Sequence, residues 1–186
     1  AGWCSKHITA LLQSRGCDAM GLAGCDASLI KASRRAPRLL SDGKTTLDYG
    51  LIGDVKPESV NTEALHKLID SGIVPVFCAI SHDGRGELLN TNADTIASAI
   101  SAAINAELLY CFEKNGVLYS LNDPDSVIPS LDLGTYTRLK EEGRVAQGMI
   151  PKLDNAFSAL RAGAASVRIL HSESLLDGDA GTKLTL

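Results

Sequence analysis

An apolar run that directly follows an amphipathic segment constrains the fold of this chain more than any other feature. Residues 73–80 are almost continuously apolar, as expected for a strand that is covered on both faces. Residues 61–72 before them place apolar side chains at helical spacing, with Asn61 or Thr62 as the N-cap and Gly72 as a left-handed end. A helix followed at once by a buried strand is typical of α/β proteins.

The same alternation recurs along the chain. The spacing predicts helices over residues 3–14, from Ile96 to Ile104, from Leu133 to Leu139 and from Leu153 to Leu160, and strands over residues 19–22, 107–112 and 166–170. This order favours a mostly parallel sheet between helices, in which ligands bind at the carboxyl ends of the strands. The polar loops after Ile80 and Cys111 are expected to open on that edge.

Residues 31–58 break the alternation, because they lack a long apolar run and are rich in glycine and basic residues. Their pattern predicts a short hairpin or β-excursion outside the main sheet. The basic side chains are either a solvated face, which is the more common use of such a cluster, or a phosphate site.

Composition narrows the classes of protein further. A chain of 186 residues with a mean hydropathy of +0.06 suits one globular domain, and a net charge of −4 argues against a nucleic-acid binder. No stretch approaches the roughly 20 apolar residues that cross a bilayer. The five cysteines include no CxxC pair, so neither a zinc site nor a disulfide framework is indicated, and a reducing cytoplasm is expected.

A polar segment before the helix at Ile96 is the best candidate site. Asn90, Asn92 and Asp94 stand at every second position, where free backbone N–H groups and the helix dipole favour anions. The alternative is that Asn92 or Asp94 is only an N-cap, although one cap does not need three polar residues.

Lys152 is a second candidate because it stands at the start of a helix, where a positive charge is unfavourable. It is either a harmless exposed residue or a group that meets an anionic ligand.

The sequence gives little support for a P-loop NTPase or for a dinucleotide-binding dehydrogenase. The chain contains no GxxxxGK[ST] sequence, and Gly84-Arg85-Gly86 lacks the third glycine of a dinucleotide fingerprint.

Two segments, Leu89-Asn90-Thr91-Asn92-Ala93-Asp94 and Gly148-Met149-Ile150-Pro151-Lys152, closely resemble the amino acid kinase family. Within it the chain is most similar to the enzymes that phosphorylate N-acylated glutamate. Other segments match in the same order, over nearly the whole chain: Ala1-Gly2 with Lys6, Gly21-Leu22-Ala23-Gly24, residues 50–55, Gly72-Ile73-Val74-Pro75-Val76, Asn115-Gly116-Val117-Leu118 and Gly181-Thr182.

The resemblance implies a three-layer αβα sandwich with a mostly parallel central sheet. It implies transfer of the γ-phosphoryl of ATP, with Mg²⁺, to the side-chain carboxylate of an N-acyl-L-glutamate in arginine biosynthesis. It also implies a cytoplasmic homo-oligomer with small-molecule substrates, without nucleic acid or membrane partners and without a protein-held metal site.

The resemblance also assigns roles to residues. Asn90 and Asn92 correspond to substrate-binding amides, Asp94 to the carboxylate that orients the catalytic lysines, and Lys152 to the lysine that stabilises the phosphoryl group in flight. The residues that correspond to the nucleotide pocket are Glu113, Lys114, Asn115, Gly116, Val117, Leu118, Arg144, Val145 and Ala146. No general base is required, because the carboxylate that attacks is already ionised at neutral pH.

The chain departs from the family in three places. Phe112-Glu113-Lys114 replaces the family's usual nucleotide-loop residues, and residues 171–179 are shorter than usual. The family's first strand, glycine-rich phosphate loop and first catalytic lysine match nothing in this sequence. We therefore expect residues 1–186 to be one amino acid kinase domain without its N-terminal part, and this chain alone to be inactive.

Other functions remain open at this point. Carbamate kinase, aspartokinase, glutamate 5-kinase and uridylate kinase are rivals within the family, although the Asn90-x-Asn92-Ala93-Asp94 spacing favours the acylglutamate enzyme. A non-catalytic ligand-binding domain of the same fold is an alternative of a different class. The sequence does not distinguish an acetyl from a succinyl group on the substrate.

Overall fold

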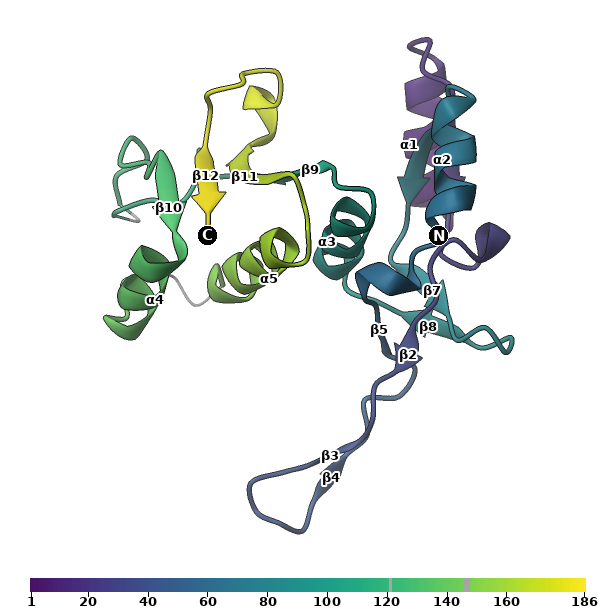
Figure 1. The fold of residues 1–186 in the computed structure, drawn as a ribbon, viewed down its shortest axis with the longest axis horizontal. Helices are drawn as coiled ribbons and strands as arrows, with labels where there is room; N and C mark the ends of the chain where they lie inside the picture. The colour runs from purple at the N-terminus through teal and green to yellow at the C-terminus, as the bar shows by residue number, and fades with distance from the viewer. Residues whose placement is uncertain (121, 146–147) are drawn as a thin grey trace. The chain divides into compact units, whose positions relative to one another are not determined.

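A computed structural model describes residues 1–120, 122–145 and 148–186 of the chain. They form two compact units, an N-terminal unit over Ala1–Ala99 and a C-terminal unit over Ile100–Leu186 (Figure 1). The predicted single domain over residues 1–186 stays a prediction, and each unit is described by itself. Within the described residues, no helix is both long and apolar enough to cross a membrane.

The N-terminal unit is built on two parallel strands with a helix before each of them. α1 (Trp3–Gln13) precedes β1 (Ala19–Leu22), and α2 (Thr62–Asp70) precedes β6 (Val74–Phe77), which pairs with β1 in parallel. α1 contacts both strands and α2 contacts β6. The predicted alternation of helix and strand is therefore confirmed here.

The predicted ends of α2 are also confirmed. The side chain of Asn61 caps the helix, because its Oδ1 accepts a hydrogen bond from the backbone N–H of Ala64 at 3.1 Å. Gly72 follows the helix with φ at +79°, a left-handed conformation that glycine adopts without steric cost.

The prediction of one strand over residues 73–80 is wrong in two respects. β6 ends at Phe77, and the chain then forms a second strand, β7 (Ile80–His82), which pairs antiparallel with β8 (Leu88–Asn90). The predicted polar loop after Ile80 therefore starts later, and it runs from Asp83 to Glu87 between β7 and β8. β6 is also only partly covered, with Val74 45% exposed.

The β-excursion predicted for residues 31–58 is confirmed. η1 (Asp26–Ser28) leads into it, β2 (Ser33–Arg34) pairs antiparallel with β5 (Gly53–Asp54), and η2 (Pro57–Ser59) follows. Between these strands, β3 (Arg38–Leu39) and β4 (Thr46–Leu47) form a hairpin that extends away from them (Figure 1).

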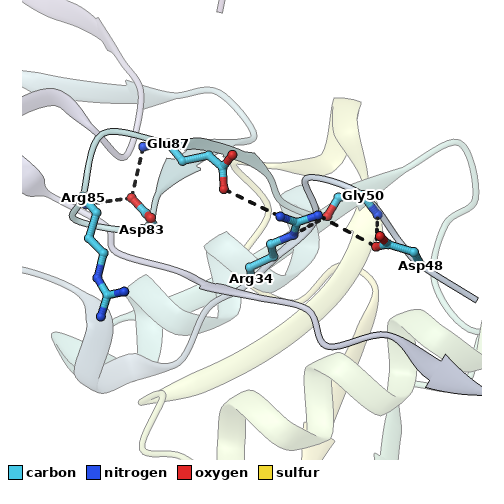
Figure 2. Close-up of polar contacts among 6 residues, drawn as sticks. All are labelled: Arg34, Asp48, Gly50, Asp83, Arg85 and Glu87. Atoms are coloured by element: carbon cyan, nitrogen blue, oxygen red, sulfur yellow. Dashed lines mark hydrogen bonds and ion pairs between the residues drawn. The ribbon is translucent and has the colours of Figure 1, made fainter.

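Two basic residues of this excursion, Arg34 and Arg35, contact carboxylates, as expected for a solvated face. Figure 2 shows Arg34 between Asp48 and Glu87, with N···O distances of 3.9 and 4.0 Å, while its Nε donates to the carbonyl of Gly50 at 3.0 Å. Exposed ion pairs of this kind contribute little stability. The contact does tie the excursion to the loop that leads into β8.

The C-terminal unit has a four-stranded sheet in the order β10-β12-β11-β9. β10 pairs with β12 and β11 with β9 in parallel, whereas β11 and β12 are antiparallel. The elements in chain order are α3 (Ala93–Ala103), which begins in the N-terminal unit, β9 (Glu107–Phe112), β10 (Ser130–Asp132), α4 (Leu133–Glu141), α5 (Ile150–Arg161), β11 (Ser166–His171), η3 (Ser172–Ser174) and β12 (Thr182–Thr185).

Buried positions alternate along most of these strands and give the sheet one covered face, although Leu170 of β11 is also fully buried. α4 and α5 lie along one side of the sheet (Figure 1), where α5 contacts β11 and β12 and α4 contacts β10. The side chains on the covered face are Leu108, Tyr110, Leu131, Val167, Ile169 and Leu184. The apolar periodicity predicted α3, β9, α4, α5 and β11. It did not predict the short η3, the three-residue β10 or β12, whose four residues include only one apolar side chain, Leu184.

A polar cluster of three side chains joins α4 to α5. The hydroxyl of Tyr136 donates to Asp154 Oδ1 at 2.7 Å, and Lys140 Nζ donates to both oxygens of Asp154 at 2.8 and 2.9 Å. Burial of Tyr136 and its hydrogen bond to Asp154 raise the pKa of the phenol to about 12. The hydrogen bond to Asp154 also raises the pKa of Lys140.

This cluster predicts a loss of stability in alkali. The folded state holds the Tyr136 proton up to a pH near 12, whereas the unfolded chain releases it near 10. The free energy of unfolding should therefore fall as pH rises through this range, and it should fall less steeply in Tyr136→Phe. Urea unfolding at a series of alkaline pH values tests this, and parallel curves for the two proteins would contradict it.

Candidate functional site

The segment from β8 into α3 alternates exposed and buried positions. Asn90 ends β8 with an exposed side chain, Thr91 is buried, and Asn92 is exposed at the start of α3. Asp94 is partly exposed in the first turn of the helix. The predicted polar groups at a helix N-terminus are therefore present.

Backbone and buried side-chain contacts hold Asn90 in place. Its N–H donates to the carbonyl of Leu51 at 2.8 Å, which joins the end of β8 to the excursion. The neighbouring Thr91 hydroxyl hydrogen-bonds the buried Ser81 hydroxyl at 2.6 Å. A Cβ on Gly53 would lie 2.9 Å from Leu89 Cβ and 3.1 Å from Thr91 Oγ1, so glycine is required for this close approach.

The structure shows which residue caps α3. Asn92 Oδ1 accepts from the backbone N–H of Thr95 at 3.2 Å, and the Asn92 carbonyl accepts from Ile96 at 3.1 Å. Asn92 is thus the N-cap, and Asp94 lies two residues inside it. The prediction that one of these residues is only an N-cap is therefore confirmed for Asn92. Capping does not explain why an acidic residue stands at position 94.

Six of the predicted nucleotide-pocket residues line one hollow of the C-terminal unit. This first hollow contains about 540 Å³ of empty space, including solvent at its mouth. Its lining is mainly apolar, with the cationic side chains of Lys114 and Arg144 among it. The lining residues are Lys114, Gly116, Val117, Leu118, Tyr119, Ile128, Leu139, Arg144, Val145 and Met149.

A second hollow, more open than the first, shares Lys114, Gly116 and Met149 with it. It contains about 1010 Å³ including open solvent, and its other lining residues are Cys111, Phe112, Glu113, His171 and Ser172. These residues lie at the carboxyl ends of β9 and β11 and just beyond them. The predicted ligand edge of the sheet is therefore hollowed at this place.

Lys152 lies beside the second hollow. It is the third residue of α5, as predicted, and its Nζ is 4.2 Å from the centre of the Phe112 ring. A cation over an aromatic face is attracted by the ring's quadrupole, which helps to hold the ammonium group in place. Phe112, which departs from the family pattern, thus contacts the candidate catalytic lysine.

Three other predicted positions complete the account. Glu113 lines the second hollow. Asn115 lies between the lining residues, and its Nδ2 donates to the carbonyl of Pro124 at 3.4 Å. Ala146 lies outside the described residues.

The structure does not test the predicted pairing of Asp94 with Lys152. Asp94, like Asn90 and Asn92, belongs to the N-terminal unit, whereas Lys152 belongs to the C-terminal unit, so this pairing stays a prediction.

Some lining residues carry no signal of their own in the sequence. Leu139 and Ile128 are apolar residues like many others in the chain, and only the fold brings them to the hollow. Met149 could have been found, because it belongs to the Gly148-to-Lys152 segment that carries the family resemblance. His171 and Ser172 could have been found as the polar end of a predicted strand.

The two hollows suit a ligand with an apolar part and an anionic part. The apolar walls could cover an apolar or aromatic group, and Lys114, Arg144 and the neighbouring Lys152 bring positive charge to the same place. The described residues hold no group of three or more His, Cys, Asp and Glu side chains suited to a metal ion. A magnesium ion bound mainly through phosphates and water would need no such group.

Comparisons with known proteins agree with this geometry. The amino acid kinase family matches residues 1–171. Acetylglutamate kinase from Cytophaga hutchinsonii is 45% identical over 192 residues, which cover 98% of this chain and 70% of the relative. Acetylglutamate kinase from Bacteroides fragilis is 43% identical over 187 residues, which cover 98% of this chain and 68% of the relative.

Solved structures share the fold at lower identity. A Streptococcus mutans protein matches with a TM-score of 0.74 at 23% identity, and the match covers 97% of this chain and 66% of the S. mutans chain. Carbamate kinase from Giardia lamblia bound to AMP-PNP matches with a TM-score of 0.63 at 14% identity, and the match covers 97% of this chain and 66% of the carbamate kinase chain. They confirm the predicted fold class. The family match and the identities to curated relatives together show that this chain belongs to the amino acid kinase family.

Proposed function

We propose that this chain belongs to an acetylglutamate kinase, which transfers the γ-phosphoryl of ATP, with Mg²⁺, to the side-chain carboxylate of N-acetyl-L-glutamate. The product is an acyl phosphate, and the reaction is a step of arginine biosynthesis. The observation that carries this proposal is the paired hollow of the C-terminal unit with Lys152 beside it. The curated relatives at 43 and 45% identity favour acetylglutamate over the substrates of rival kinases.

The chemistry suits the residues present. A carboxylate oxygen of the substrate attacks the γ-phosphorus, the bond to the bridging oxygen breaks, and ADP leaves. No proton has to be removed, because the attacking carboxylate is ionised at neutral pH. The protein must position two anions and stabilise the charge on the transferred group, which asks for fixed cations such as Lys152.

The proposal includes separate roles for the two units. The N-terminal unit would hold acylglutamate through Asn90, with Asp94 orienting the lysines, and the C-terminal unit would hold ATP in the first and second hollows. Mg²⁺, when bound with ATP, would neutralise part of the phosphate charge. Asn92 would contribute to the substrate site through its position at the start of α3, since its side-chain oxygen already caps the helix.

The cellular setting is part of the proposal. We propose a cytoplasmic homo-oligomer that binds small molecules, neither nucleic acid nor membrane. The exposed apolar side chains of Trp3, Ile8 and Leu11 on α1 support self-association, because exposed apolar patches often mark protein interfaces. Sedimentation equilibrium tests this point, and a monomer at every concentration would contradict it.

The direct test is ATP-dependent formation of the acyl phosphate. Hydroxylamine converts an acyl phosphate to a hydroxamate, which can be measured while ADP release is followed in parallel. Full-length protein should form hydroxamate with N-acetyl-L-glutamate and much less with carbamate, aspartate or unacylated glutamate. ATP binding without any hydroxamate would favour a non-catalytic binding domain instead.

Asn90→Ala should act mainly on substrate binding. An amide that holds the substrate equally in ground and transition states affects KM and leaves kcat nearly unchanged. We expect KM for acetylglutamate to rise about tenfold, while KM for ATP stays near wild type. Asn61→Ser, which keeps an oxygen at the cap of α2, is the matched control. An unchanged KM in Asn90→Ala would remove Asn90 from the substrate site.

A further inference from the structure

The nucleotide loop, residues 113–118, is held at Val117 by contacts on two sides. The carbonyl of Val117 accepts from the N–H of Ile128 at 2.8 Å, and Ile128 also lines the first hollow. The N–H of Val117 donates to the side-chain oxygen of Thr182 on β12, at 2.8 Å. Thr182 is fully buried and lies 65 positions further along the chain.

The surroundings of this hydrogen bond leave little freedom. A Cβ on Gly116 would lie 2.7 Å from Thr182 Oγ1 and 3.0 Å from Val127 Cγ1, so only glycine permits the loop to lie this close to β12. Gly181 has φ at +86°, and a Cβ there would overlap the carbonyl oxygen of Ile169. The two glycines together bring the Thr182 hydroxyl to the Val117 amide.

We infer that Thr182 is a positioning residue for nucleotide binding, which fixes the nucleotide loop through the backbone N–H of Val117. This inference rests on the proposed ATP site. Gly116, Val117 and Leu118 line the first hollow, so a shift of this loop changes the surface that ATP contacts. Thr182 itself lines neither hollow and acts through Val117.

Removing the hydroxyl leaves the Val117 amide buried without its acceptor. The loop lowers its free energy by moving off β12, and ATP must then bind the smaller fraction of molecules whose loop remains in place. Thr182→Val keeps the shape of the side chain and should weaken ATP binding at least about fivefold. Thr182→Ser keeps the acceptor and should bind ATP like wild type.

Isothermal titration of Mg·ATP into the full-length protein gives the decisive comparison. Thr185→Val is the matched control, because Thr185 lies exposed on the same strand. We expect Kd to rise in Thr182→Val and to stay near wild type in Thr182→Ser and Thr185→Val. A merely structural threonine would lower the melting temperature of Thr182→Val and leave Kd unchanged, and that result would overturn the inference.

Failure of the wild-type protein to bind ATP and failure of Thr182→Val to fold can each be distinguished from failure of the inference. If the full-length protein binds no ATP, the proposed function fails, independently of the loop contact. If Thr182→Val does not fold, amide hydrogen exchange of Val117 in wild type takes its place. Protection of this amide without ATP supports the anchoring, and exchange at the rate of an open amide overturns it.

Discussion

Lys152→Ala is expected to lower kcat of the full-length enzyme about 100-fold or more, the range for losing one preorganised group that stabilises transition-state charge. Lys152 lies third in α5, where the helix dipole disfavours a cation, and its Nζ lies 4.2 Å from the centre of the Phe112 ring beside the second hollow. We propose that this ammonium group serves an anionic ligand, which is the transferred phosphoryl group.

The control separates catalysis from stability. Lys67→Ala removes an exposed lysine of α2 that is paired with Glu63 at 2.6 Å, and should leave kcat unchanged. Lys152→Ala should fold normally, and its melting temperature should stay the same or rise slightly, because a cation leaves a helix N-terminus. Wild-type kcat together with a lowered melting temperature would make Lys152 a structural residue only.

Asp94→Asn should lower kcat by a similar factor while KM for acetylglutamate changes little. Asparagine keeps the shape of aspartate and removes its charge, so the loss reports on the carboxylate's role in orienting lysines around the phosphates. The helix keeps its cap, since the cap is Asn92 Oδ1 with the Thr95 N–H. Loss of a first-turn acid costs only about 0.3–1 kcal/mol of stability.

Steady-state kinetics distinguish the two roles of Asp94. Asp70→Asn, an exposed position near the end of α2, is the matched control for removing one carboxylate. If Asp94 only stabilises the helix dipole, Asp94→Asn and Asp70→Asn will both keep wild-type kcat. That outcome would remove Asp94 from the catalytic machinery and leave Lys152 without its proposed partner.

Local chemistry explains why some elements could be predicted. Asn61 and Gly72 mark the two ends of α2, because a side-chain oxygen caps free N–H groups and glycine adopts a left-handed turn. The apolar runs at residues 107–112 and 166–170 became β9 and β11. Period and capping are local properties, and the sequence displays them directly.

Other elements depend on contacts between distant residues. The run at residues 73–80 looks like one strand, but β7 begins at Ile80 because it pairs with β8. β12 has too few apolar residues to stand out, and its place between β10 and β11 defines it. Thr182 shows the same limit, since its contact with Val117 joins residues 65 positions apart.

The candidate site was predicted by resemblance more than by pattern. Lys114, Gly116 and Arg144 were assigned to the nucleotide pocket through the family, and the fold brings them to one hollow. From the sequence pattern alone, either Asn92 or Asp94 could be the N-cap of α3, and either could belong to the candidate site. The hydrogen bond from Thr95 to Asn92 distinguishes them, and periodicity cannot show which of two polar side chains turns back to a helix end.

The central claim is that ATP binds at the nucleotide loop of the C-terminal unit. Amide hydrogen exchange of the full-length protein, with and without Mg·AMP-PNP, tests it most directly. We predict slower exchange on adding the nucleotide at residues 113–118 and around Arg144, with little change at the exposed hairpin of β3 and β4. Unchanged exchange at residues 113–118, with or without protection elsewhere in the chain, would contradict the account.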